Sequence, residues 1–181
     1  MQTAPNDLLF PFDDPRDAAA WQGVADAVMG GVSTGLFQPA LNGDGTHPIA
    51  AFVGEIVLHS GKGFASVHSP PGRYDLSEKT GFILRVRGDG RRYALTLRTH
   101  HMMEVSTPPS GPYSWRHGFD TQPGLWQECR LPLSDFRPMS KGHEIENIPP
   151  LDPSDIAHIG FLISDKQGGL FRLEVDWVGV Y

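Results

Sequence analysis

The C-terminal stretch Leu-Phe-Arg-Leu-Glu-Val-Asp-Trp-Val-Gly-Val-Tyr, residues 170–181, decides the fold class. Apolar and charged side chains alternate along it with a period of two, the spacing of a β-strand with one face in a core and one in water. The chain is therefore predicted to end in a long, half-buried strand. Its predicted apolar face holds Phe171, Leu173, Val175 and Trp177, and its polar face holds Arg172, Glu174 and Asp176.

The same alternation recurs along the chain between short turn-like segments. With 21 glycines and 16 prolines among 181 residues, the composition favours many short strands over long helices. One helical turn is predicted within 17–24, and the segments 29–48 and 138–153 are predicted to be loops. The predicted strands are 52–59, 64–69, 81–87, 92–100, 113–120, 125–133 and 156–165, with 8–12 as a candidate edge strand.

This pattern predicts an all-β protein built as an antiparallel β-sandwich or jelly roll. Strands resume directly after each irregular segment, so a single domain is predicted over residues 1–181. The glycine-bearing turn at 88–90 is short enough to predict a β-hairpin between 81–87 and 92–100.

Composition excludes several classes of function. The net charge of −6 argues against a sequence-independent grip on nucleic acid or on an anionic membrane. No apolar stretch is long enough to span a bilayer, so no integral membrane segment is predicted. The lone Cys129 excludes an internal disulfide and reads as a buried, inert thiol. Because residues 1–14 resemble neither a secretory signal nor a transit peptide, a cytoplasmic location is predicted.

Catalytic and metal-binding motifs are weak. Residues 31–35 match the G-x-S-x-G pattern around the nucleophile of serine hydrolases, but the segment that follows contains Pro39, Gly43 and Gly45 and cannot form the required helix. A glycine-rich turn is the better interpretation. The tandem His100–His101 points to opposite faces of a predicted strand, and no set of metal ligands is placed by spacing. No catalytic residue, metal or cofactor is predicted.

Arginines and aromatic residues offer candidate binding groups. Arg85 and Arg87 share one strand face and Arg92 and Arg98 share another, so a hairpin could bring several guanidiniums together to grip an anion. Tyr113 and Trp115 could stack a sugar ring, or they could be core residues; Trp126 and Trp177 read as core. The alternative for the arginines is a set of surface ion pairs with acidic neighbours, namely Asp89, Glu55 and Asp120.

Four segments, in order along the chain, resemble the complex I intermediate-associated protein 30 family. Together they cover residues 21–181, with departures at Lys62, at His68, where the family usually has arginine, and at 140–142. The segments are Trp21 followed by D-A-V-M-G-G-V-S at 26–33; F-x-G at 52–54 with G-F-A-S-V at 63–67; R-G-D-G-R-R-Y at 87–93; and F-L-I-S-D-K-Q at 161–167 with F-R-L-E-V-D-W at 171–177.

The resemblance implies a galactose-binding-domain-like jelly roll, in agreement with the strand pattern. It also implies a non-catalytic assembly factor or chaperone with a protein partner, such as subunits of a respiratory complex, and a bacterial-type, stand-alone copy because no transit peptide is recognised. A carbohydrate- or small-ligand-binding, lectin-like module is the alternative function. The densest of these motifs carry five residues that are predicted to form a polar patch at one end of the sandwich, namely Asp26, Met29, Arg87, Asp89 and Tyr93. Arg91, Tyr113 and Trp115 are further candidate binding residues.

Overall fold

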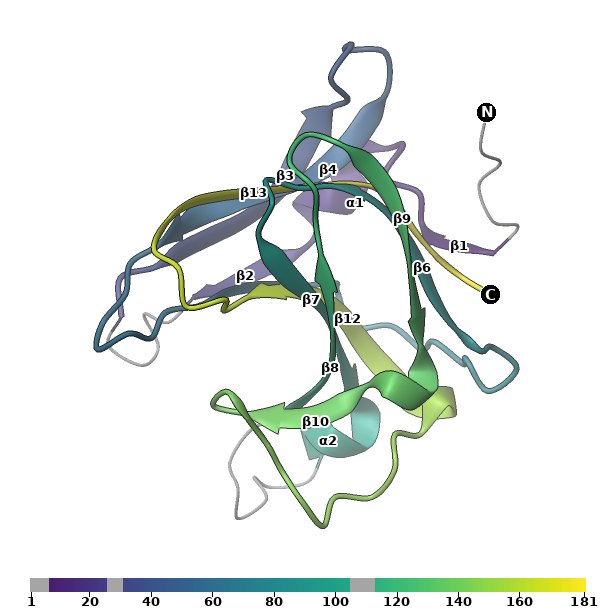
Figure 1. Cartoon of the computed structure of the whole chain (residues 1–181). Helices are drawn as coiled ribbons and strands as arrows, with labels where there is room; N and C mark the ends of the chain where they lie inside the picture. Colours follow the sequence, from purple (N-terminus) through teal and green to yellow (C-terminus); the bar gives the residue numbers. More distant parts are fainter. Residues whose placement is uncertain (1–6, 26–30, 105–112) are drawn as a thin grey trace.

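The computed structural model describes residues 7–25, 31–104 and 113–181, and in these ranges two antiparallel sheets pack face to face (Figure 1). Sheet A has the strand order β3-β4-β13-β6-β9, with β1 pairing with part of β13. Its strands are β1 (Leu8–Phe10), β3 (Thr34–Leu41), β4 (Pro48–Ile56), β6 (Gly81–Arg87), β9 (Trp126–Pro132) and β13 (Gly169–Val180).

Sheet B has the order β11-β10-β8-β7-β12-β5-β2. Its strands are β2 (Gln22–Ala25), β5 (Ala65–His68), β7 (Arg92–Thr99), β8 (Ser114–Asp120), β10 (Arg137–Ser140), β11 (His143–Glu144) and β12 (Ile156–Ile163). The helical segments of the described residues are short, namely α1 (Pro15–Ala19), α2 (His100–Glu104), η2 (Leu133–Asp135) and η3 (Pro153–Asp155). The predicted all-β antiparallel sandwich is therefore confirmed.

Aromatic side chains from both sheets fill the space between them. Trp21 stacks on Phe37 of sheet A and on Phe161 of sheet B, with ring centroids 4.5 Å and 5.8 Å apart. The rings of Phe52 and Phe171 in sheet A pack edge to face at 4.8 Å, and each lies 6.4 Å from the ring of Tyr93 in sheet B. Rings of this size remove large apolar areas from water, so these contacts contribute much of the force that holds the two sheets together.

A β-bulge in β13 corrects the predicted faces of the last strand. The register with β6 shifts between Val175 and Trp177, so that Trp177 lies opposite Arg85. Directly paired residues share a face, and Trp177 therefore lies on the outer face of sheet A, although it is buried. Val178 and Val180 take the inward positions instead. A single extra residue reverses the alternation, and the sequence pattern does not reveal it.

The predicted hairpin across residues 88–90 is wrong. The strands β6 and β7 belong to different sheets, and the turn carries the chain from one layer to the other. The arginines of the two strands therefore lie on opposite outer faces of the sandwich and do not converge. A glycine-rich turn reverses the direction of the chain, but it does not decide whether the next strand pairs in the same sheet, as in a hairpin, or in the other sheet, as it does here.

Two of the predicted loops contain strands. The segment 29–48 holds β3, an edge strand of sheet A, and 138–153 overlaps β10 and contains β11. An edge strand tolerates Pro39, because one side of its backbone has no ladder to donate to. Gly35 within β3 also fits closely, since a Cβ added there would lie 2.7 Å from the Cβ of Ala65 in sheet B. Glycine and proline thus mark an edge and a close approach here, not a loop.

Candidate functional site

One end of the sandwich gathers most of the segments that carry the family-like motifs. It is formed by the β6–β7 turn (88–91), the β12–β13 loop (164–168), the connection from β4 to β5 (57–64) and the residues just before β3; we call it the motif end. A Cβ added to Gly168 would lie 3.5 Å from the carbonyl oxygen of Ile56 and 3.7 Å from the side chain of Leu58, so two of these segments touch. Segments far apart in the sequence therefore form one surface.

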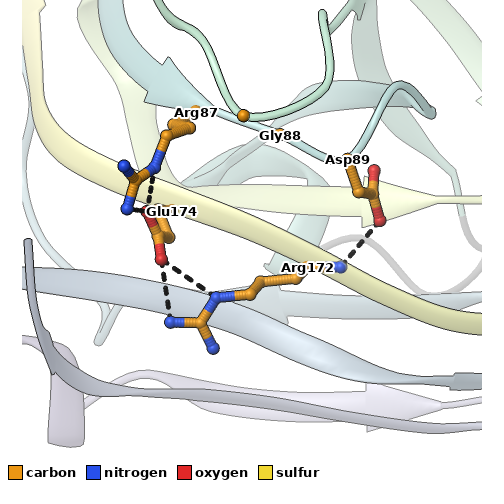
Figure 2. A pocket seen from close by; sticks show the side chains of 6 residues that line it. Arg87, Gly88, Asp89, Arg172 and Glu174 are labelled. Atoms are coloured by element: carbon orange, nitrogen blue, oxygen red, sulfur yellow. Dashed lines mark hydrogen bonds and ion pairs between the residues drawn. The ribbon is translucent and has the colours of Figure 1, made fainter. Parts of the chain in front are cut away.

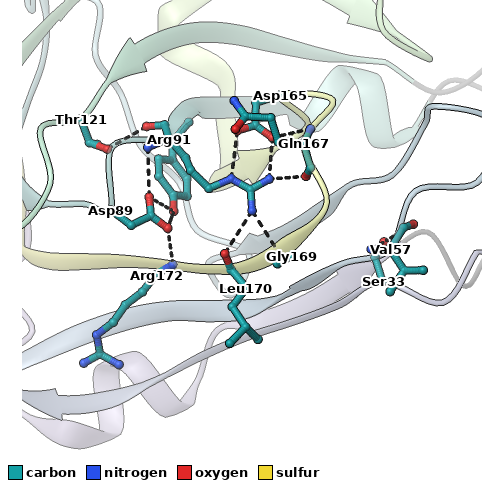
Figure 3. Close-up of polar contacts among 11 residues, drawn as sticks. Ser33, Val57, Asp89, Arg91, Thr121, Asp165, Gln167, Gly169, Leu170 and Arg172 are labelled. Carbon is teal, nitrogen blue, oxygen red and sulfur yellow. Dashed lines mark hydrogen bonds and ion pairs between the residues drawn. The ribbon is translucent and has the colours of Figure 1, made fainter.

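Arg91 ties this end together (Figure 3). Its Nε and Nη2 donate to the two carboxylate oxygens of Asp165 at 2.9 Å and 2.7 Å, and Nη2 also donates to the carbonyl of Gln167. Its Nη1 donates to the carbonyls of Gly169 and Leu170 at 3.3 Å and 3.2 Å. All five N–H donors of the guanidinium are thus used, and they join the β6–β7 turn to the β12–β13 loop.

The partner of Arg91 is a buried carboxylate. The side chains of Arg91 and Asp165 are 10% and 5% exposed. Burial alone would raise the pKa of Asp165, but the hydrogen bonds from Arg91 and from the Gln167 backbone, together with the arginine charge, lower it. Asp165 is therefore ionised at neutral pH, and its charge is neutralised inside the fold.

Asp89 fixes the turn itself. Its Oδ1 accepts from the backbone N–H of Arg91 at 3.1 Å and from the Tyr93 hydroxyl at 3.0 Å, and its Oδ2 accepts from the backbone N–H of Arg172 at 2.8 Å. The Tyr93 ring is buried in the core, and burial together with the adjacent Asp89 carboxylate raises the pKa of its hydroxyl. This phenol is neutral and acts as a hydrogen-bond donor.

A shallow cavity of about 150 Å³ lies beside this turn on the outer face of sheet A (Figure 2). The carboxylate of Glu174, 8% exposed, accepts from Nε of Arg87 at 2.5 Å and from Nε and Nη2 of Arg172 at 2.9 Å and 2.8 Å. Arg87 also lies over the ring of Trp126, with its Cζ 5.0 Å from the ring centroid. Arg172 remains half exposed at the mouth of the cavity. The cavity thus presents one accessible guanidinium edge.

Exposed apolar side chains gather at the same end of the molecule as this cavity. Of the nine large apolar residues that the described ranges leave exposed, six lie at or next to the motif end. Leu170, 80% exposed, and Leu36, 62% exposed, are on the outward side of β13 and β3, with β4 between them. The six residues are Val32, Leu36, Val57, Leu58, Leu125 and Leu170.

The serine of the G-x-S-x-G pattern is a structural residue. Ser33 is buried, and its hydroxyl accepts from the backbone N–H of Val57 at 3.1 Å and donates to the carbonyl of the same residue at 3.3 Å (Figure 3). This closes the backbone beside the end of β4, where strand pairing stops. A hydroxyl used in this way ties two segments together and is not displayed as a nucleophile.

The predicted binding residues fall into distinct environments. Arg87 and Asp89 line the cavity, whereas Arg91 and Tyr93 are turned inward with their polar groups paired. Trp115 is 8% exposed and belongs to the core. Whether any of them binds a ligand stays a prediction, but the two inward residues and Trp115 offer little surface to one. Of the remaining candidates, Tyr113 is partly buried and packs against the core. Asp26 and Met29 lie outside the described residues.

Two features of this end were missed at the sequence level. Arg172 and Glu174 were read only as the polar side of a strand, and Leu36 was placed in a loop. The sequence does hold a signal for this surface. Leu170 is an apolar residue at a position of the last strand where the alternation predicts a polar side chain, next to Arg172 and Glu174, and it is exposed in the structure. In the described residues no group of three or more His, Cys, Asp or Glu is placed to hold a metal ion, and no helix is long and apolar enough to cross a membrane.

The sequence pattern of the complex I intermediate-associated protein 30 family matches residues 10–175. The chain belongs to this family. The mouse mitochondrial complex I intermediate-associated protein 30 is 36% identical over 108 residues, which are 60% of this chain and 32% of the mouse protein. The Drosophila melanogaster protein of that name is 28% identical over 196 residues, covering 96% of this chain and 62% of the fly protein. The chain thus spans about a third to three fifths of these relatives.

Solved structures support the fold alone, because their sequence identity is low. A family 11 carbohydrate-binding module from Clostridium thermocellum, in complex with a β-1,3-1,4-mixed-linked tetrasaccharide, superimposes with a TM-score of 0.69 at 14% identity. That match covers 96% of this chain and 94% of the module. An exo-β-agarase matches with a TM-score of 0.61 at 12% identity, over 97% of this chain and 25% of that enzyme. The galactose-binding-like sandwich is therefore confirmed.

The predicted cytoplasmic location is wrong. The curated relatives from mouse, fly and Caenorhabditis elegans are named as mitochondrial proteins, which points to mitochondria and not to the cytoplasm. The prediction relied on the absence of a recognisable leader at the start of this chain. Because the chain spans only part of its relatives, its first residues carry no information on targeting. The bacterial-type origin and the single-domain boundaries remain predictions.

Proposed function

We propose that this member of the complex I intermediate-associated protein 30 family is a non-catalytic protein-binding domain that holds subunits of respiratory complex I during assembly. The observation that carries the proposal is the motif end, where rigidly fixed segments present exposed leucines next to a half-exposed arginine. An apolar centre with arginine beside it is the composition of protein-interaction surfaces. The names of the relatives supply the complex on which such a surface would act.

The rigidity of this surface supports a binding role. The guanidinium of Arg91 holds the loop that begins β13, and the Asp89 carboxylate fixes the backbone of Arg172. The backbone carbonyl of Leu170 is already hydrogen-bonded, so the side chain of Leu170 projects from a fixed backbone. Little further ordering of this backbone is needed when a partner docks. Preorganised surfaces lose less entropy on binding, which favours affinity.

A catalytic role has less support. The hydroxyl of Ser33 is used by the backbone of Val57, and the polar groups of Arg91 and Tyr93 are satisfied internally. Catalysis needs a nucleophile or base whose reactive atom faces a substrate. The charged side chains that line the cavity of the motif end pair with one another or with the backbone; they are Arg87, Asp89, Arg172 and Glu174.

Carbohydrate binding also has less support. Sugar-binding surfaces stack rings on exposed aromatic side chains. Trp115 lies in the core, and Trp126 is covered on one face by the guanidiniums of Arg85 and Arg87, at 5.6 Å and 5.0 Å from its ring centroid. The likeness to carbohydrate-binding modules is therefore treated as a likeness of fold.

Site-specific photocrosslinking tests the proposal. A photoreactive residue replaces Leu170 at the motif end or, as a matched control, Leu41, which is 58% exposed at the far end of β3. Each full chain is incubated with solubilised mouse mitochondria, irradiated and analysed by mass spectrometry. We expect complex I subunits to be crosslinked from position 170 and not from position 41. Equal yields from both positions, or products from position 170 without any complex I subunit, would contradict the proposal.

A surface variant provides a second measurement. Leu36→Asp with Leu170→Asp places charge on the apolar patch without touching the core, so the thermal midpoint should stay within about 2 °C of the unmodified chain. The same pair should abolish crosslinking from a probe placed at Val32. Leu41→Asp should leave both properties unchanged.

A further inference from the structure

The outer face of sheet B carries two arginines and two histidines on four adjacent strands. Arg116 of β8, Arg98 of β7, His158 of β12 and His68 of β5 form what we call the basic face. Arg98 pairs directly with His158 across the ladder, and a second row runs from Arg116 through Thr96 and Gly160 to His68. A Cβ at Gly160 would lie 2.7 Å from Oγ1 of Thr96, so a larger side chain would crowd the middle of the face.

Among the described residues, no ion pair joins the four side chains of this face to a carboxylate, in contrast to the opposite sheet. On the outer face of sheet A, Arg85 pairs with Asp176 at 3.0 Å, and Arg87 and Arg172 share Glu174. The strands of sheet B contain two acidic residues, namely Asp120, which pairs with Arg92 at one end of the sheet, and Glu144 of the edge strand β11, which is exposed and forms no ion pair with a described residue. Uncompensated positive charge in a chain of net charge −6 calls for an explanation.

Neither arginine of the basic face has an acidic partner among the residues that the structure describes. Arg116 is partly buried, and among the described residues its one polar contact is the hydroxyl of Ser114, at 2.9 Å from Nε. Burial lowers the pKa of this guanidinium. Arg98 is exposed and makes no hydrogen bond or ion pair with any described residue. Arg116 is therefore a partly desolvated cation, which an incoming anion would stabilise, and Arg98 is an exposed cation beside it.

The imidazole rings of His158 and His68 have the same hydrogen-bond partner. Nδ1 of His158 and Nδ1 of His68 both face the carbonyl oxygen of Ser69, at 2.8 Å and 3.1 Å, so each Nδ1 carries the proton. Their Nε2 atoms make no hydrogen bond within the described ranges. Burial and the nearby cations, including Arg98, lower the pKa of His158. The charge of a bound carboxylate would offset both effects and favour uptake of a proton at Nε2, which would then donate a hydrogen bond to the carboxylate.

The spacing of the basic face favours a chain of separated anionic groups over a single anion. Four adjacent strands span about 14 Å at ~4.8 Å per strand. An extended peptide advances ~6.7 Å for every second residue, so acidic side chains at three alternate positions span about 13 Å. We propose that the basic face binds an extended acidic segment of a partner protein, whose alternate carboxylates meet Arg116, Arg98 and the two histidines. This goes beyond the function proposed for the motif end, because it concerns the opposite sheet.

Fluorescence anisotropy with the full chain tests this proposal. The probe is a labelled peptide with glutamate at three alternate positions separated by serine, and its control has glutamine at those positions. Arg98→Glu reverses one charge of the basic face, whereas Arg92→Glu is the matched control on the same strand and the same face, since Arg92 is exposed and already paired. Neither exposed substitution disturbs the core.

We expect the glutamate peptide to bind, the glutamine peptide to bind at least about tenfold more weakly, and Arg98→Glu to weaken binding about tenfold. Arg92→Glu should change the affinity less than about twofold, and added salt should weaken binding. In the bound state, the NMR signals of the His68 and His158 rings should shift. The proposal is overturned if both peptides bind equally, if Arg98→Glu binds as well as the unmodified chain, or if inorganic phosphate or an oligogalacturonate occupies the face while the peptide does not. None of these outcomes bears on crosslinking from position 170.

Discussion

Replacing Arg91 by methionine separates a structural role from a binding role. Methionine keeps an unbranched apolar side chain of similar reach but removes all five N–H donors. The buried carboxylate of Asp165 then loses its cation, and the carbonyls of Gln167, Gly169 and Leu170 lose their shared donor. Water can reach Leu170, which is 80% exposed, so the cost comes mainly from Asp165.

The protonation of Asp165 sets the size of this cost. Removing one partner of a buried ion pair costs about 3–5 kcal/mol. The orphaned carboxyl can instead take up a proton at neutral pH, which costs ~1.36 kcal/mol for each pH unit above its unfolded pKa of ~3.9, or about 4 kcal/mol at pH 7. Arg91→Met should therefore lower the free energy of unfolding by about 4 kcal/mol at pH 7. For a chain of this size, that lowers the thermal midpoint by about 10–15 °C.

Urea unfolding followed by tryptophan fluorescence measures this cost. At pH 4 the carboxyl is close to its unfolded pKa, so the penalty of Arg91→Met should shrink to about 1 kcal/mol. The double variant Arg91→Met with Asp165→Leu should recover part of the loss at pH 7, because it leaves no buried charge. An unchanged unfolding midpoint, or a penalty that is equal at both pH values, would refute the structural role and return Arg91 to the candidate binding groups.

Three further predictions concern the same end of the molecule. Gly54→Ala should lower the free energy of unfolding by about 3 kcal/mol, because its Cβ would lie 2.1 Å from a backbone oxygen of β3, whereas Gly168→Ala, with 3.5 Å to its nearest neighbour, should cost under about 1 kcal/mol; thermal melts compare the two. Ser33→Ala should cost about 1–3 kcal/mol in urea unfolding by leaving both polar groups of Val57 unpaired. Because the folded pKa of Asp165 is lowered, its contribution is complete above about pH 4 and is lost as the pH falls further, so Asp165→Asn should flatten the acid side of a stability–pH curve.

The sequence predicted what depends on local periodicity. The apolar pattern located β6, β7, β9 and β12 to within about two residues at each end, because each buries one face or both against the other sheet, whereas β4 begins four residues before the predicted strand 52–59. It failed where a single residue changes the register, as in the bulge of β13, and where a turn joins two layers, as at residues 88–90. Both failures depend on which strands pair, and that is decided by contacts distant in the sequence.

The candidate site was predicted as a region and not as a set of roles. The motif containing Arg87, Asp89, Arg91 and Tyr93 does lie at one end of the sandwich, where Asp165 meets it from the other end of the sequence. Residue type alone could not distinguish Arg91, whose N–H donors are all used inside the fold, from Arg87, which lines the cavity. That distinction depends on burial, which follows from the layer in which each strand lies.

The family-like motifs at this end consist largely of residues that bind other parts of the same chain. Ser33, Asp89, Arg91 and Asp165 each satisfy backbone or buried groups, so their pattern describes how the motif end is built. The side chains that a partner would meet, such as Leu170, project from that framework and can vary without changing it. In the function proposed above, this framework holds the exposed residues in place, and those exposed residues select the partner.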